Sequence, residues 1–89
     1  MREVLTGVRT GVSEGGAPLE VSYYLTEEDV MCGHFGCESY GVRVVEAGGE
    51  EAAFPHLTVS RTRIVELLTA LCGAFVTPVT AGDVVADWL

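Results

Sequence analysis

Lysine, asparagine and glutamine are absent from this chain of 89 residues, and its five basic side chains are all arginines. Without lysine there is no Schiff-base chemistry and no P-loop lysine to bind a nucleotide phosphate. The formal net charge is −8 at pH 7. Because nucleic acids and anionic membrane surfaces bind clusters of cations, this charge argues against both kinds of partner.

Long apolar runs are also missing. No run approaches the roughly 18–20 residues of a membrane-spanning helix, and the N-terminus lacks the apolar segment of a signal peptide. The three cysteines, an odd number, favour reduced thiols in the cytoplasm. The hydrophobic fraction is nevertheless 48%. Because so short a chain buries only roughly 60–65% of its unfolded surface, we expect much of this apolar surface either in the core or in an interface.

The segment 60–89 is expected to be helical and to supply the apolar partner for the strands before it. Apolar side chains from Ile64 to Phe75 recur at i, i+3, i+4, i+7, i+8 and i+11, which is the spacing of one helix face. Ser60 is the expected N-cap of this helix. Pro78 should prevent its continuation, because proline lacks the backbone N–H and its ring clashes with the preceding turn.

A short second helix is expected after this proline, with Thr80 as its N-cap and an apolar face that includes Val85 and Trp88. At about ten residues it is too short to be stable alone. The sequence therefore predicts that Trp88 is docked, either on this chain or on a partner.

The residues before this tail alternate between apolar and polar side chains, which predicts strands. In the first strand, over residues 2–12, Val4 and Val8 are expected on one face and Arg9 on the other. Further strands are expected over residues 19–31, 40–46 and 52–59, and the acidic run 27–29 is expected to form a solvated bend or strand end. Pro55 predicts an edge position or a bulge for the last strand.

Together these elements predict a single domain of the α+β class, residues 1–89. Its three- to four-stranded antiparallel meander is followed by a long helix and a short C-terminal helix packed on one sheet face. Residues 1–18 are expected to be a less ordered N-terminal strand and loop, and residues 60–89 the helical tail.

The C-terminal tail resembles a small family of uncharacterised Firmicute (Clostridia) proteins. The resemblance lies in the run Val76–Pro78 and the following DVVADWL, preceded by ELLTAL, and in the strand segments YYLTEEDV and YGVRVVE, so it covers residues 20–89. The family usually has an apolar-His-Leu step after the proline, whereas this chain has residues 79–82, Val-Thr-Ala-Gly. Because the family has no assigned function, the resemblance implies a shared fold and no catalytic residue or cofactor.

Cys32, His34 and Cys37 are the sharpest local feature, because two thiols and an imidazole within six residues are potential zinc ligands. The C-x4-C spacing lacks a second pair of ligands, so we favour a glycine hairpin that carries cysteines on both strands. A disulfide between the two cysteines is disfavoured by the expected compartment. No set of residues has the spacing of a catalytic or cofactor site.

The leading hypothesis is a non-enzymatic protein-interaction module that self-associates, most simply as a homodimer. The contact is expected through the open sheet face, an edge strand or the last helix. The interface candidates are Trp88, Val85, Tyr24, Arg61 and Arg63. The alternative hypothesis is a metal or thiol site at the Cys32–Cys37 hairpin.

Overall fold

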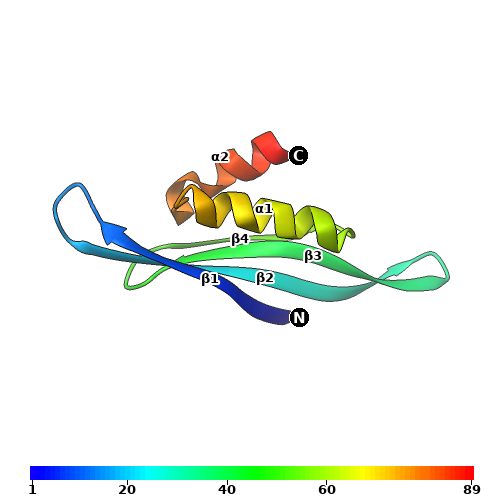
Figure 1. Ribbon diagram of the computed structural model, residues 1–89. Coiled ribbons are helices and arrows are strands. Elements are labelled where there is room, and N and C mark those ends of the chain that lie inside the picture. Colours follow the sequence, from blue (N-terminus) through cyan, green and yellow to red (C-terminus); the bar gives the residue numbers. More distant parts are fainter.

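The computed structural model describes residues 1–89, apart from the side chain of Cys32. Four strands precede two helices: β1 (Arg2–Val12), β2 (Pro18–Cys32), β3 (Phe35–Glu46), β4 (Glu51–Thr58), α1 (Arg61–Gly73) and α2 (Pro78–Trp88). Each strand pairs antiparallel with the next, in the order β1-β2-β3-β4. Both helices lie on one face of this sheet (Figure 1). The predicted α+β class and antiparallel meander are confirmed, with four strands.

The core lies between α1 and the two central strands. On β2 the residues Val21, Tyr23 and Leu25 alternate with polar side chains and are buried, as the period of two predicts. Ile64 and Leu67 on α1 are fully buried as well. Each such aliphatic side chain contributes about 1.5–3 kcal/mol relative to an exposed one. The sheet therefore has a helix face, which carries the core, and an opposite open face.

The two helices begin differently. α1 starts as predicted, because the Ser60 hydroxyl oxygen accepts a hydrogen bond from the backbone N–H of Arg63 at 3.2 Å. The predicted cap of α2 at Thr80 is wrong: α2 begins at Pro78, and its N-cap is Thr77, which makes no side-chain cap bond. Proline fits the first position of a helix, where no backbone N–H donor is needed.

The predicted placement of Phe75 on the face of α1 is also wrong. α1 ends at Gly73, and Phe75 adopts a left-handed conformation with φ of 52°. The N–H of Val76 donates to the carbonyl of Leu71 at 3.0 Å, and that of Phe75 donates to Cys72 at 3.2 Å. This pair of bonds is a Schellman motif, in which a phenylalanine occupies the position that usually holds glycine.

β2 and β3 are longer than the sequence predicted. They join through a turn at Gly33 and His34, where Gly33 has a φ of 69°. The expected bend at residues 27–29 is absent, because Glu27 pairs with Tyr40 and these residues lie inside the β2–β3 ladder. Cross-strand neighbours override their low strand propensity.

Beyond Glu27 and Tyr40 the sheet narrows to a two-stranded ribbon, residues 28–39, which we call the β2–β3 arm. β1 starts opposite Glu27 and β4 ends opposite Tyr40, so neither strand accompanies the arm. The arm and the β1–β2 turn project at opposite ends of the molecule (Figure 1), whose extents are 53 × 23 × 17 Å. Cys37 in the arm is disulfide-bonded, which corrects the expectation of reduced thiols.

Candidate interaction surface at the β1 edge

β1 is an edge strand with many exposed apolar side chains. It pairs with β2 on one side, and no described strand lies along its other side. The exposed fractions are 48% for Val4, 53% for Leu5, 44% for Val8 and 71% for Val12. A long apolar edge is a template for pairing with another chain. β1 pairs with β2 from Arg2 to Val12, with one register shift between Leu5 and Gly7.

The opposite edge strand, β4, is protected. It has 8 residues against 11 in β1. Pro55 has no N–H to offer to a further strand, and His56 has a φ of 56° at a register shift in the β3–β4 ladder. The predicted edge position and bulge are thus confirmed. Of the two edges, β1 is the one open to strand addition.

A bulge at Thr6 decides which β1 side chains share a face. The register to β2 shifts between Leu5 and Gly7, so Thr6 is an extra residue. Val4 lies opposite the core residue Leu25 and is therefore on the helix face, whereas Leu5 and Val8 are both on the open face. The predicted common face for Val4 and Val8 is wrong, because the extra residue breaks the period of two.

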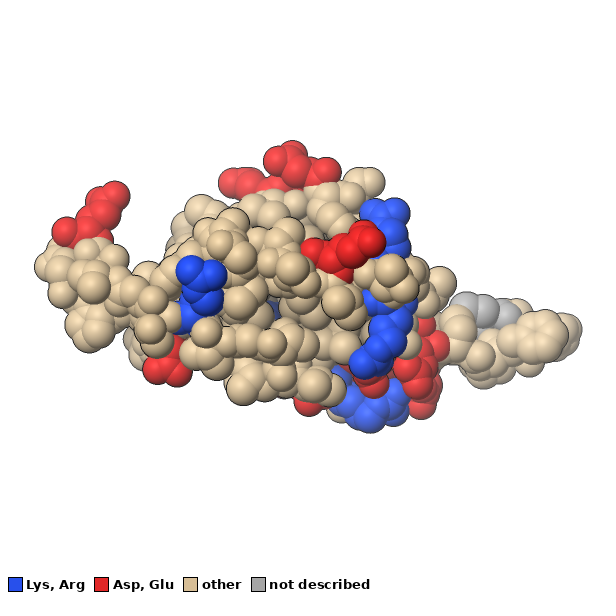
Figure 2. Space-filling model, in the orientation of Figure 1, with Lys and Arg blue, Asp and Glu red and all other residues tan. Residues whose placement is uncertain are grey.

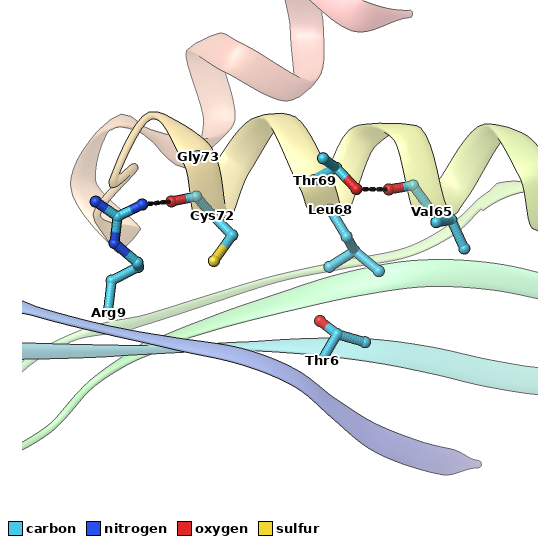
Figure 3. Close-up of a pocket in the computed structure, with 7 residues that line it drawn as sticks. All are labelled: Thr6, Arg9, Val65, Leu68, Thr69, Cys72 and Gly73. Atoms are coloured by element: carbon cyan, nitrogen blue, oxygen red, sulfur yellow. Dashed lines mark hydrogen bonds between the residues drawn. The ribbon is translucent and has the colours of Figure 1, made fainter.

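A pocket of about 440 Å³ lies beside this edge, between β1 and α1 (Figure 3). In the figure the Leu68 and Cys72 side chains point from α1 toward the sheet, and Thr6 points from the sheet toward α1. The lining residues are Thr6, Arg9, Val65, Leu68, Thr69, Cys72 and Gly73. The Thr6 hydroxyl donates to the Tyr23 carbonyl at 2.9 Å, and the Thr69 hydroxyl to the Val65 carbonyl at 2.8 Å. Because both hydroxyl protons are used internally, the walls are suited mainly to apolar groups.

Arg9 attaches β1 to the end of α1. Its Nη1 donates to the Cys72 carbonyl at 2.9 Å, and its guanidinium carbon lies 5.6 Å from the centre of the Phe75 ring. A cation is favourable at this end of a helix, where the dipole is negative. Gly11 leaves room for the ring, because a Cβ there would lie 2.7 Å from Cε2 of Phe75. These contacts hold β1 in place without a neighbour on its outer side.

Tyr23 lies in the core, near Cys72 and Arg9. It is fully buried, and its hydroxyl donates to the Val76 carbonyl at 2.7 Å. Burial raises the pKa of Tyr23, the Cys72 thiol adds to this shift, and Arg9 opposes it. The tyrosine is therefore a neutral donor that ties β2 to the segment between the helices.

The open face of the sheet is crossed by charged side chains. Arg43 lies at the centre and makes ion pairs with Glu3 at 3.0 Å and with Glu51. Its guanidinium carbon is 5.6 Å from the centre of the Tyr24 ring. Docking an apolar partner on this face would desolvate these charges, so the β1 edge is the better candidate surface.

A second polar cluster lies at the start of α1. Glu27, whose side chain is 12% exposed, accepts from Arg2 at 3.3 Å and from Arg61 at 2.9 Å. The Tyr40 hydroxyl donates to Glu38 at 2.9 Å, and this hydrogen bond raises the pKa of Tyr40. These groups come from β1, β2, β3 and α1 and pair with one another. The cluster therefore stabilises the packing of these elements.

The predicted interface residues are mostly engaged within the chain. Trp88 is half-buried against the core, and the Arg63 guanidinium carbon lies 4.7 Å from the centre of its ring. Val85 is buried at 3% exposure, so it offers no surface to a partner. Arg61 pairs with Glu27, as described above, and Tyr24 is half-buried on the open face. The structure does not bring these five residues together as one patch.

The metal candidates Cys32, His34 and Cys37 form no metal site among the described side chains. Among the side chains that the structure describes, no three histidine, cysteine or acidic groups lie close enough to hold a metal ion. His34 is exposed at the tip of the arm, Cys37 is disulfide-bonded, and the candidate role of Cys32 lies outside the described side chains.

Leu5, Val8 and the pocket were not among the interface residues predicted from the sequence. The signal available in the sequence was the adjacent pair Val4-Leu5, which puts an apolar side chain on each face of a strand.

Acidic side chains lie over α2 and toward the ends of the molecule in Figure 2, and the middle of the visible face is mostly uncharged. In the orientation of Figure 1, this face is the one that presents the β1 edge, with α1 above it.

Within the described chain, neither helix has the length and apolarity needed to cross a membrane. No curated protein and no solved structure matches this chain. A family of unknown function (DUF6514) matches residues 2–89, which confirms the expectation of a family without an assigned function. The chain therefore belongs to this family of unknown function.

Proposed function

We propose that this chain is a non-enzymatic protein-interaction module that binds its partner by strand addition along β1. The observation that carries the proposal is an edge strand of 11 residues with four well-exposed apolar side chains. In strand addition the backbone of the added strand supplies hydrogen bonds, and pockets for alternate side chains supply specificity. The pocket between β1 and α1 is placed to receive such a side chain.

The rigid attachment of β1 supports this mode of binding. Arg9 and Phe75 fix the strand to the end of α1, so its outer edge is already extended before a partner arrives. A preorganised edge avoids the entropy cost of ordering a loop at the moment of binding. Glu27, a carboxylate of the kind that serves in catalysis, is engaged in ion pairs with Arg2 and Arg61 that stabilise the fold.

A cytoplasmic location belongs to the same proposal. The disulfide at Cys37 is the observation that opposes it, because cytoplasmic thiols are normally kept reduced. The proposed binding mode uses no thiol, so it applies in either compartment.

Photocrosslinking in cells that produce the protein tests the β1 surface without knowledge of the partner. A benzophenone amino acid is placed at Val12 on β1, and in separate variants at Val79 or Leu89 on the opposite side of the chain's core. The exposed fractions are 71%, 70% and 74%, so the positions are matched for access. We expect a discrete crosslinked band from position 12 alone. Equal crosslinking from the control positions, or none from position 12, would contradict the proposal.

A further inference from the structure

We infer that the partner is a second copy of this chain, paired antiparallel along β1 so that Leu5 of each copy lies opposite Val8 of the other. This inference rests on the proposed strand addition at β1 and names its partner. It follows from the register of β1, from the faces on which its side chains lie, and from the distribution of charge.

The bulge at Thr6 makes β1 complementary to itself in one register. Residues directly opposite in an antiparallel pair lie on the same face. Pairing Leu5 with Val8 of the second copy satisfies this rule along the whole strand. It also pairs Glu3 with Thr10 on the open face, and on the helix face it pairs Arg2 with Gly11 and Val4 with Arg9. The two bulges then meet at the twofold axis, so that the bend of one strand is matched by that of the other.

Two neighbouring registers, reached by sliding one strand by two residues in either direction, also pair residues of the same face near the N-terminus. Each of them places an unfavourable pair elsewhere in the strand. Sliding the strands one way places Arg2 opposite Arg9, and like charges directly opposite are destabilising. Sliding them the other way places Gly7 opposite Val8, which lie on different faces. The register with Leu5 opposite Val8 avoids both faults over the full length of β1.

Charge also favours this edge as the contact between two copies. The chain has 13 acidic residues, but β1 contains only Glu3, which is paired with Arg43 at 3.0 Å. Arg2 and Arg9 on the same strand are positively charged and attract the negatively charged second copy. Two copies of a strongly acidic chain can therefore meet along β1 with little local repulsion.

The contact also covers the exposed apolar side chains. On the open face Leu5 and Val8 of both copies come together around the axis. On the helix face Val4 lies beside Arg9 of the other copy, at the mouth of the pocket that Arg9 lines. The result is one continuous sheet with the helices of both copies on the same side. Its outer edges are the protected β4 strands, so the assembly closes as a dimer.

The test mixes two variants of the full chain that each carry one added cysteine, Leu5→Cys and Val8→Cys, under mild oxidation. Leu5 and Val8 are about half exposed in the single chain, so both variants are expected to fold. Each variant alone should give little covalent dimer, because identical positions are not opposite in this register. The mixture should give a disulfide-linked dimer of twice the 9.4 kDa chain mass. A mixture of Leu5→Cys with Thr10→Cys, on the same face but out of register, is the matched control, and oxidised wild type controls for Cys72.

Light-scattering mass of the wild type over a concentration series accompanies the crosslinking. A mass that doubles, with crosslinking confined to the Leu5→Cys and Val8→Cys mixture, supports the inference. A dimer that crosslinks equally in the control mixture, or not at all, overturns the register. A chain that stays monomeric at all concentrations overturns the second copy as partner. In that case a crosslink in cells from Val12 to a different protein would leave the proposed function standing.

Discussion

The Tyr23 side chain carries a hydroxyl into the apolar core, and the Val76 carbonyl accepts its hydrogen bond at 2.7 Å. In the Tyr23→Phe variant this buried carbonyl loses its donor, which costs about 1–2 kcal/mol of unfolding free energy. Urea unfolding at pH 7 measures the loss. Tyr24→Phe on the half-exposed open face is the control, and we expect a change within about 0.5 kcal/mol. Equal effects of the two substitutions would contradict the role of the Val76 bond.

The raised pKa of Tyr23 also predicts how stability depends on pH. Burial favours the neutral phenol in the folded chain, whereas the unfolded tyrosine ionises near its ordinary pKa of about 10. Above that pH the unfolded state binds fewer protons than the folded state, so stability falls as pH rises toward the folded pKa. We expect wild type to lose stability from about pH 10 upward, and Tyr23→Phe to lose it less steeply. Tyr40, whose pKa is raised by its hydrogen bond to Glu38, contributes a further part of the slope.

Gly41 is a position where the backbone of β4 approaches β3 too closely for any side chain. A Cβ there would lie 2.3 Å from the Phe54 carbonyl oxygen and 2.7 Å from the Pro55 Cα. Because these are backbone atoms at a bulge, they cannot move aside cheaply, and Gly41→Ala should destabilise the fold by about 3 kcal/mol. Gly36→Ala in the same strand meets open space and should be neutral or slightly stabilising. Thermal unfolding of the pair is the measurement, and similar melting temperatures would contradict the argument.

At the scale of elements, α2 depends on its docking. Its buried residues are Pro78, Ala81 and Val85, and Trp88 adds a half-buried ring beneath the guanidinium of Arg63. We expect Trp88→Ala to cost about 2 kcal/mol, less than for a fully buried tryptophan, and Arg63→Ala about 0.5–1 kcal/mol.

A double-mutant cycle measured by urea unfolding isolates the contact between these two side chains. The effect of Arg63→Ala should largely vanish when Trp88 is already alanine. Neither variant should change the light-scattering mass, because Arg63 on α1 and Trp88 on α2 are neither in β1 nor in the lining of the pocket beside it. Loss of the dimer in Trp88→Ala protein that is still folded would place the interface at the last helix instead.

Sequence patterns predicted the helices and strands correctly where interactions between residues close in the sequence determine the structure. The apolar spacing from Ile64 and the cap at Ser60 predicted α1, and Pro55 predicted the edge position of β4. The errors fall where a local preference meets a tertiary contact. Phe75 leaves the helix through a Schellman motif, and its ring packs beside Arg9 and Gly11 of β1. The acidic run that starts at Glu27 stays in β2 because Arg2 and Arg61 neutralise its first carboxylate.

The candidate surface was less predictable than the fold. The bulge at Thr6 changes which β1 side chains share a face. Gly7 beside it is compatible with a bulge, but a glycine alone does not show where the extra residue lies. The pocket joins Arg9 to Cys72, which are far apart in the sequence and meet only when α1 folds back over the sheet. Exposure of Leu5 and Val8 follows from the sheet order, which places β1 at an edge. The predicted meander already implies that its first and last strands are edges, but alternation does not show which of the two edges stays open to another strand.

At the scale of the whole molecule, stability should vary along its 53 Å axis. The middle is covered by α1, whereas the β2–β3 arm extends past both neighbouring strands. A two-stranded ribbon is marginally stable by itself. Backbone amides of the arm should therefore open locally and exchange with solvent much faster than those of residues 21–25 and 42–44, which carry the core.

β1 should behave differently from the arm if two copies pair along it. In a dilute monomer its outer amides face solvent and exchange fast, and in the dimer they become part of the ladder. Hydrogen exchange followed by mass spectrometry at two protein concentrations should show β1 slowing at the higher one, by about tenfold for each 1.4 kcal/mol of added protection. The arm should exchange equally fast at both. Val8→Lys, which places a charge on the edge, should remain monomeric and lose the concentration dependence. A mass that doubles while β1 exchange stays constant would place the interface elsewhere on the molecule.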